Sequence, residues 1–237
     1  MKFHSLLWTF FLPITLSINT MNGQTIKTIG PKDQGIILIS ALTATGDLDN
    51  LKLQLNTALD SGLTINEIKE AMVQLYAYCG FPRSLNGINI FRKVLDERHA
   101  KGKKDNLGKE IEVENKTVDK YEQGRNVLEY LTQTPQSKPA PGFGEFAPRI
   151  DVFLKEHLFA DIFNSDVLSF QQRELVTIAA LASMNGVAPQ LQAHIGMGMN
   201  TGITIHQIQE TFDLIEKHIG KDQAETSREV LSQTVRN

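Results

Sequence analysis

Cysteine is almost absent from this chain of 237 residues, since Cys79 is the only one. A single thiol cannot form an internal disulfide, so we expect an apolar core, not covalent cross-links, to hold the fold. The histidines are isolated as well, because none stands in an HxxxH or HExxH spacing and no acidic cluster accompanies them. The sequence therefore predicts neither a disulfide framework nor a metal site.

An excess of positive charge is also missing. The chain has 24 Lys and Arg against 27 Asp and Glu, a formal net charge of −3. Such a balance lacks the basic footprint that nucleic acid or an anionic membrane surface attracts. We therefore expect no nucleic-acid partner and, for the mature chain, no membrane partner.

Long apolar runs are absent beyond the first residues. Lys2 precedes an apolar run from Leu6 to Ile18, and small and polar residues follow up to Gly23. This is the order of a secretory signal peptide. The alternative is a membrane anchor, but a spanning helix needs about 20 apolar residues and this run contains Pro13. We therefore predict that residues 1–23 are cleaved and that the mature chain is exported, periplasmic or secreted.

What the sequence does contain is an internal repeat. Residues 46–70 read GDLDNLKLQLNTALDSGLTINEIKE, and residues 186–210 read GVAPQLQAHIGMGMNTGITIHQIQE. A constant offset of 140 residues places Gly62 on Gly202. Self-similarity at a fixed offset predicts two related structural units in tandem.

The repeated segments carry the period of α-helices. Apolar residues recur at spacings of three and four, and few strand-like alternations compete with them. Thr64 with Glu67, and Thr204 with Gln207, match the capping box that opens a helix. Pro82 follows Gly80 and should end the helix there. These patterns predict an all-α protein.

A linker separates the two predicted units, and the second unit has one more predicted helix than the first. The first unit spans residues 33–99 and has four helices, and residues 100–144 form a charged linker with a short helix from Tyr121 to Thr132. The second unit spans residues 145–237. We expect its helices at Phe146–Phe163 and near 171–185, 189–201, 205–219 and 222–235.

Two strings carry a family resemblance. They are ALDSGLTINEIKEAMVQLYAYCGFPRSLNGINIFRKVLDE in the first half and RELVTIAALASMNGVAPQLQAHIGMGMNTGITIHQIQE in the second. They resemble the carboxymuconolactone decarboxylase family, which also contains the alkyl hydroperoxidase D-like proteins. The resemblance implies two tandem units of the alkyl hydroperoxidase D-like fold. Single-unit relatives assemble as trimers or hexamers, so it also implies a homo-oligomer, with three chains rebuilding a six-unit ring.

The resemblance also implies a catalytic pair. Alkyl hydroperoxidase D-like relatives carry a Glu, a Cys-x-x-Cys pair and a His along two helices, and here Glu174 and His194 occupy the outer positions. The stretch between Ser183 and Gln190 contains no cysteine, which excludes a two-cysteine peroxidase cycle. Measured along the helices from the turn, the two residues differ by ~10 Å, so direct contact is not expected. The alternatives are that Glu174 reaches His194 through water or substrate, or that it pairs with Arg173 or a neighbouring subunit.

The two copies differ where a site would need them. His194 matches Gln54 in the first copy, whereas the aromatic turn of the first copy has no counterpart in the second. This predicts a composite site in which His194 faces a wall that includes Tyr76 and Tyr78. Those tyrosines lie on different faces of one helix, so at most one should line a pocket. The alternative for His194 is a histidine packed between helices.

Two further residues have competing interpretations. Cys79 falls at a helix C-terminus, where the dipole disfavours a thiolate, so a structural thiol is expected over a nucleophile. Arg83 is placed to bind a substrate carboxylate bidentately. The alternative is a salt bridge from Arg83 to Glu67, Glu70 or Asp96.

The sequence leaves more than one function open. The first is a carboxymuconolactone decarboxylase-like enzyme that acts on a small carboxylic acid or lactone, with no cofactor and with His194 or Glu174 managing the proton. The alternatives are an exported peroxidase-like antioxidant that uses Cys79 and a non-catalytic protein that binds a small ligand.

Overall fold

A computed structural model describes residues 28–110 and 119–236, so the predicted leader at residues 1–23 lies outside the described residues. Within these ranges the chain forms ten α-helices and one π-helix and no strand. None of the described helices has the length and apolar character to cross a membrane. The all-α prediction is confirmed.

The first unit consists of three helical elements, α1 (Pro31–Thr45), α2 (Leu48–Asp60) and α3 (Ile65–Ala100). Gly46 ends α1 with a left-handed φ of 79°, a conformation that costs glycine little. Thr64 and Glu67 form the predicted capping box at the start of α3. The local signals in the sequence therefore place these helix ends correctly.

The break predicted between Gly80 and Pro82 is a sharp bend inside α3. Gly80 has φ 81° and ψ 158°, which is not helical. The hydroxyl of Ser84 donates to the carbonyl of Met72 at 2.7 Å. In a straight helix these residues would be about 18 Å apart along the axis. The bend therefore folds the second half of α3 back beside the first.

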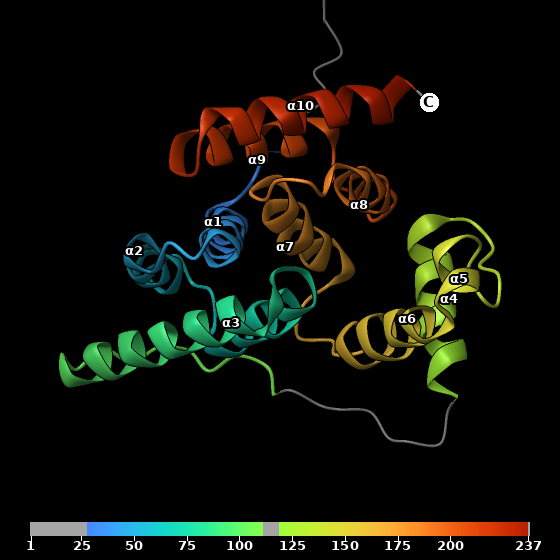
Figure 1. The fold of residues 1–237 in the computed structure, drawn as a ribbon. Helices are drawn as coiled ribbons and strands as arrows, with labels where there is room; N and C mark the ends of the chain where they lie inside the picture. Colours follow the sequence, from blue (N-terminus) through green and yellow to red (C-terminus); the bar gives the residue numbers. More distant parts are fainter. Residues whose placement is uncertain (1–27, 111–118, 237) are drawn as a thin grey trace, which may run out of the picture.

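The second unit repeats this arrangement with α7 (Phe170–Ala182), α8 (Ala188–Asn200), α9 (Ile205–His218) and α10 (Lys221–Arg236). Figure 1 shows α1 and α7 side by side at the centre, with α3 on one side of them and α9 and α10 on the other. The apolar side chains of both units form one continuous core. The two units therefore share a single interior.

A buried polar network also joins the units. Arg173 of α7 is fully buried and donates to Gln74 and Glu70 of α3, at 3.0 Å each. It also donates to the carbonyl of Ser165 at 2.7 Å. Because a buried charge is tolerated only with such partners, the network fixes α3 against α7.

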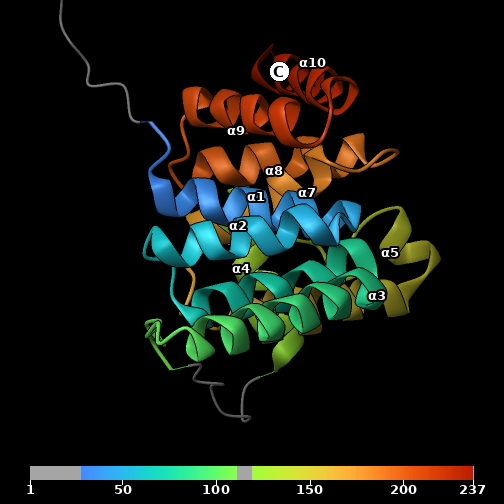
Figure 2. The ribbon, with the colours of Figure 1, turned by 90° about the vertical axis from the view of Figure 1, so that its left-hand side faces the viewer.

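Residues 119–163, here called the connecting module, contain α4 (Lys120–Thr132), α5 (Phe143–Phe146), α6 (Pro148–Val152) and the π-helix η1 (Phe153–Ile162). The expected single helix from Phe146 to Phe163 is thus divided into elements, with a π-helical hydrogen-bond pattern in its second half. The module packs through α4 against α8 and through η1 against α3, on the side away from α2 (Figures 1 and 2). A second apolar cluster fills these contacts.

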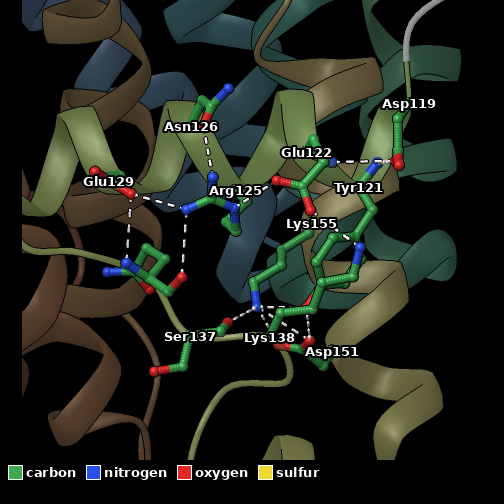
Figure 3. Close-up of polar contacts among 11 residues, drawn as sticks. Asp119, Tyr121, Glu122, Arg125, Asn126, Glu129, Ser137, Lys138, Asp151 and Lys155 are labelled. Atoms are coloured by element: carbon green, nitrogen blue, oxygen red, sulfur yellow. Dashed lines mark hydrogen bonds and ion pairs between the residues drawn. The ribbon is translucent and has the colours of Figure 1, made fainter.

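A buried ion pair holds the connecting module together (Figure 3). Lys155 of η1 is fully buried and lies 2.9 Å from a carboxylate oxygen of Asp151. Its ammonium group also donates to the Tyr121 hydroxyl at 2.8 Å and to the Ser137 carbonyl at 2.9 Å. Gly124 permits this approach, because a Cβ there would lie 1.8 Å from the Lys155 carbonyl oxygen. The pair therefore joins α4, α6, η1 and the loop after α4.

Candidate functional site

Glu174 and His194 are in direct contact. The Nδ1 of His194 lies 2.7 Å from Oε2 of Glu174, so the expectation that they would not touch is wrong. That expectation counted residues 183–186 of the turn as helix. Counted from the true ends, Ala182 and Ala188, Glu174 lies about 12 Å and His194 about 9 Å from the turn. Side chains easily span the remaining difference of about 3 Å.

The environment of Glu174 makes this pairing specific. Glu174 is fully buried, and its other oxygen, Oε1, has no hydrogen-bond partner among the described residues. The suggested partner Arg173 is bound to Glu70 and Gln74 instead. His194 is therefore the group that compensates the buried carboxylate, and the carboxylate fixes the orientation of the imidazole.

The second ring nitrogen of His194 faces a tyrosine. Nε2 lies 3.4 Å from the hydroxyl of Tyr78, and the two rings meet edge to face with centroids 5.4 Å apart. Burial and the negative charge of Glu174 raise the pKa of Tyr78 well above its usual range. The Tyr78 hydroxyl therefore stays protonated; it donates to Nε2 of a neutral imidazole and accepts from Nε2–H of an imidazolium.

His194 lies in the wall of a cavity of about 870 Å³. Both units and the connecting module line the cavity, with walls from α3, α4, α5, α6, η1 and α8. Tyr76 lines it and stacks on Phe81 at 4.3 Å between ring centroids. The aromatic turn of the first unit and the histidine of the second thus meet at one cavity, with Tyr76 in its lining and Tyr78 behind His194.

Arg83 lies outside this cavity lining. It is exposed, and its Nη1 lies 3.7 Å from the sulfur of Met184. Within residues 28–110 and 119–236 it forms no ion pair with Glu67, Glu70 or Asp96. Among the described residues, the side chains that line the cavity include no Lys, Arg, Asp or Glu. A carboxylate bound there would meet imidazoles, neutral polar groups and apolar groups, not a guanidinium.

Cys79 is a partly buried thiol at the bend of α3. Its Sγ donates to the carbonyl of Leu75 at 3.2 Å. Burial raises the pKa of Cys79, although the charge of Arg83 acts in the opposite direction. Cys79 is also outside the cavity lining. These features match the expected structural thiol more closely than a nucleophile.

The cavity contains a second histidine that the sequence analysis did not single out. His157 of η1 lines the wall, its Nδ1 lies 3.1 Å from Asp161, and its ring lies 5.5 Å from that of Tyr76. The spacing of four between His157 and Asp161 predicts their contact on a helix, but not the direction in which the pair points. Across the described residues, no three His, Cys, Asp or Glu side chains gather as a metal site requires.

A comparison with models of known protein families shows which family the chain belongs to. The model of the Carboxymuconolactone decarboxylase family matches residues 17–93 and 148–233. The chain belongs to this family. Its two matches correspond to the two tandem units, and the second includes His157, Glu174 and His194. The first match begins inside the segment predicted as a leader. A search of curated proteins gives no match.

Proposed function

We propose that this member of the carboxymuconolactone decarboxylase family is a cofactor-free carboxy-lyase. Its substrate is a small carboxylic acid whose carboxyl group stands next to an electron-withdrawing lactone or carbonyl. The observation that carries the proposal is the 2.7 Å contact of His194 with the buried Glu174 at the wall of a largely apolar cavity. Such a pair is built to hold and move a proton.

The reaction balances with one proton. The bond between the carboxyl carbon and the α-carbon breaks, carbon dioxide leaves, and the electron pair stays on the α-carbon next to the withdrawing group. Nε2 of the His194 imidazolium then donates its proton to that carbon, and water restores the proton afterwards. Glu174 stabilises the imidazolium through Nδ1, and Tyr78 supports the ring at Nε2.

The absence of Arg and Lys from the cavity lining suits this reaction. A guanidinium would stabilise the ground-state carboxylate more than the neutral carbon dioxide that replaces it. An apolar wall instead favours the reaction, because desolvation raises the free energy of the charged carboxylate relative to that of carbon dioxide. The position of Arg83 outside the lining therefore supports decarboxylation over tight carboxylate binding.

The alternative of a one-cysteine peroxidase has less support. Cys79 has a raised pKa, bonds to a backbone carbonyl and stands apart from the cavity lining. A peroxidatic thiol needs thiolate character and access. The non-catalytic alternative is the result that a failed activity test would favour.

We also propose that the mature chain is exported and assembles as a homotrimer. The apolar leader supports export, and the fusion of two units in one chain supports a trimer that presents six units. Light scattering at micromolar concentration should give three times the mass of the mature chain. A monomer mass would contradict the assembly.

The activity is tested with carboxylated lactones in heavy water. The mature protein should release carbon dioxide and leave one deuterium on the carbon that carried the carboxyl group. His194→Gln is the matched control, and hydroperoxide consumption is followed in parallel. Carbon dioxide release that survives in His194→Gln, or no release above the blank from any lactone acid, contradicts the proposal.

A further inference from the structure

The cavity is large for a compact lactone acid. Pockets of about 300–1,000 Å³ hold drug-sized ligands, and a volume of about 870 Å³ lies near the upper end of that range. Most of its apolar lining comes from the connecting module, through α4, α5, α6 and η1. The space beyond His194 therefore has a wall suited to a second, apolar part of the ligand.

Several aromatic and aliphatic side chains of this wall are exposed. Phe143 and Phe153 are each 53% exposed, Phe81 is 59% exposed and Ile150 is 51% exposed, and all four line the same cavity. Exposed apolar side chains that gather around one hollow mark a binding surface for an apolar group. A bound ligand would remove this surface from water, which is favourable.

The charges of the lining define the rest of the ligand. In the part of the chain that the structure describes, its titratable side chains are His194, His157 and Tyr76, with no Asp, Glu, Lys or Arg. Each imidazole contacts a carboxylate through Nδ1, Glu174 in one case and Asp161 in the other. Two imidazoles suit one acid group, and the rest of the lining, which is neutral and largely apolar apart from Thr132, Gln136 and Gln190, disfavours a second charge.

We propose that the natural substrate is a monocarboxylic acid with an extended apolar substituent, aryl or alkyl, that lies on the wall formed by the connecting module. The inference rests on the proposed decarboxylation only in placing the acid group at His194. The apolar substituent contacts Phe143, Ile150 and Phe153, whereas the acid end lies against α8.

Binding of a homologous series tests the proposal without turnover. The probes are butanoate, hexanoate, octanoate and decanoate, titrated by calorimetry into the mature protein below their micelle concentrations. Each buried methylene should tighten binding about three- to fourfold until the cavity is filled. An affinity that does not change with chain length overturns the proposal.

Two phenylalanines give a matched pair of variants. Phe153 lines the cavity, whereas Phe146 is 93% exposed and is outside the lining. Phe153→Ser should weaken decanoate binding about tenfold and butanoate binding much less, because only the long chain reaches that wall. Phe146→Ser should change neither. Equal effects of the two substitutions overturn the proposal, and circular dichroism checks that both variants fold.

The outcomes separate this inference from the proposed reaction. A chain-length gradient without carbon dioxide release from any lactone acid contradicts the reaction and supports the apolar site. Turnover of a compact lactone acid without a chain-length gradient supports the reaction and overturns the substrate class. Loss of the oligomer in Phe153→Ser with unchanged decanoate binding assigns the exposed aromatics to a subunit contact and also overturns it.

Discussion

The two units share a scaffold but differ at the positions that carry chemistry. At the offset of 140, Glu174 corresponds to Gln34 and His194 to Gln54. Glu174 is fully buried and His194 is 6% exposed, whereas Gln34 is exposed and bonds to the nearby Ile29 carbonyl. The same helices thus hold a buried acid–base pair in one copy and neutral amides in the other.

The connecting module lies on the His194 side of the molecule. It covers α8 and the bend of α3 and leaves α2 uncovered (Figures 1 and 2). The same difference appears on the helices that face each pair, because Tyr78 of α3 corresponds to His218 of α9. The two units share their helices, and the connecting module lines the site of the second unit, at His194. The predictions below test that asymmetry.

The largest expected effect follows from making the second unit like the first at one position. His194→Gln installs the residue of the matching Gln54 and removes the group that we propose donates the proton. Loss of a general acid or base typically lowers the rate about 10²–10⁴-fold. We expect a fall of that size in the rate of carbon dioxide release.

The control for this variant is a check that it still folds. Among the described residues, the ring nitrogens of His194 contact only Glu174 and Tyr78, so Gln can still donate to the carboxylate. The circular dichroism spectrum should therefore remain that of the wild type. An unchanged rate in a folded variant would show that His194 is a packed helix residue.

A second prediction concerns the packing of the connecting module over the site. Asp151→Ala leaves the buried Lys155 without its carboxylate, and breaking one partner of a buried pair typically costs about 3–5 kcal/mol. We expect a loss of this size in the free energy of unfolding, measured in urea, together with weaker decanoate binding as the module loosens.

An exposed ion pair provides the comparison. Lys52 and Glu97 lie 2.6 Å apart but are 43% and 46% exposed. Such exposed pairs contribute little to the free energy of unfolding, so Lys52→Met should leave stability and binding nearly unchanged. If both variants lose the same stability, the buried pair is not what holds the module.

The sequence predicts the helices of the two units and their duplication well. The spacing of apolar residues and the capping boxes at Thr64 and Thr204 predict the starts of α3 and α9, and Gly80 marks the bend. These features depend on neighbours within one or two turns, which is the range over which sequence patterns are informative. The match of residues 46–70 with 186–210 predicts the duplication in the same way.

The cover of the site is harder to predict. Residues 100–144 have the composition of a solvated linker. Nothing in the sequence around Lys155 indicates that its side chain is buried. In the fold, α4 packs on η1 and buries that lysine through contacts distant in sequence. The composite character of the site is predictable because the two copies lack complementary residues. Its lining by the module, including His157, depends on tertiary packing.

The smallest expected effect concerns the thiol. Cys79→Ser should leave carbon dioxide release nearly unchanged, because Cys79 is outside the cavity lining. Since burial raises its pKa, Cys79 should react with iodoacetamide more slowly at neutral pH than a free thiol does. A large loss of decarboxylation in Cys79→Ser, or rapid alkylation of Cys79, would show that this thiol is reactive.

The central claim is that the site depends on the cover as well as on the pair, and moving the pair tests this most directly. The transfer variant combines Gln34→Glu and Gln54→His with Glu174→Gln and His194→Gln, and the measurement is its rate of carbon dioxide release. We predict that the rate stays at the level of His194→Gln alone, because position 34 is exposed and the module does not cover α2. Recovery to near the wild-type rate would contradict the account, since the repeated scaffold would then be sufficient for catalysis.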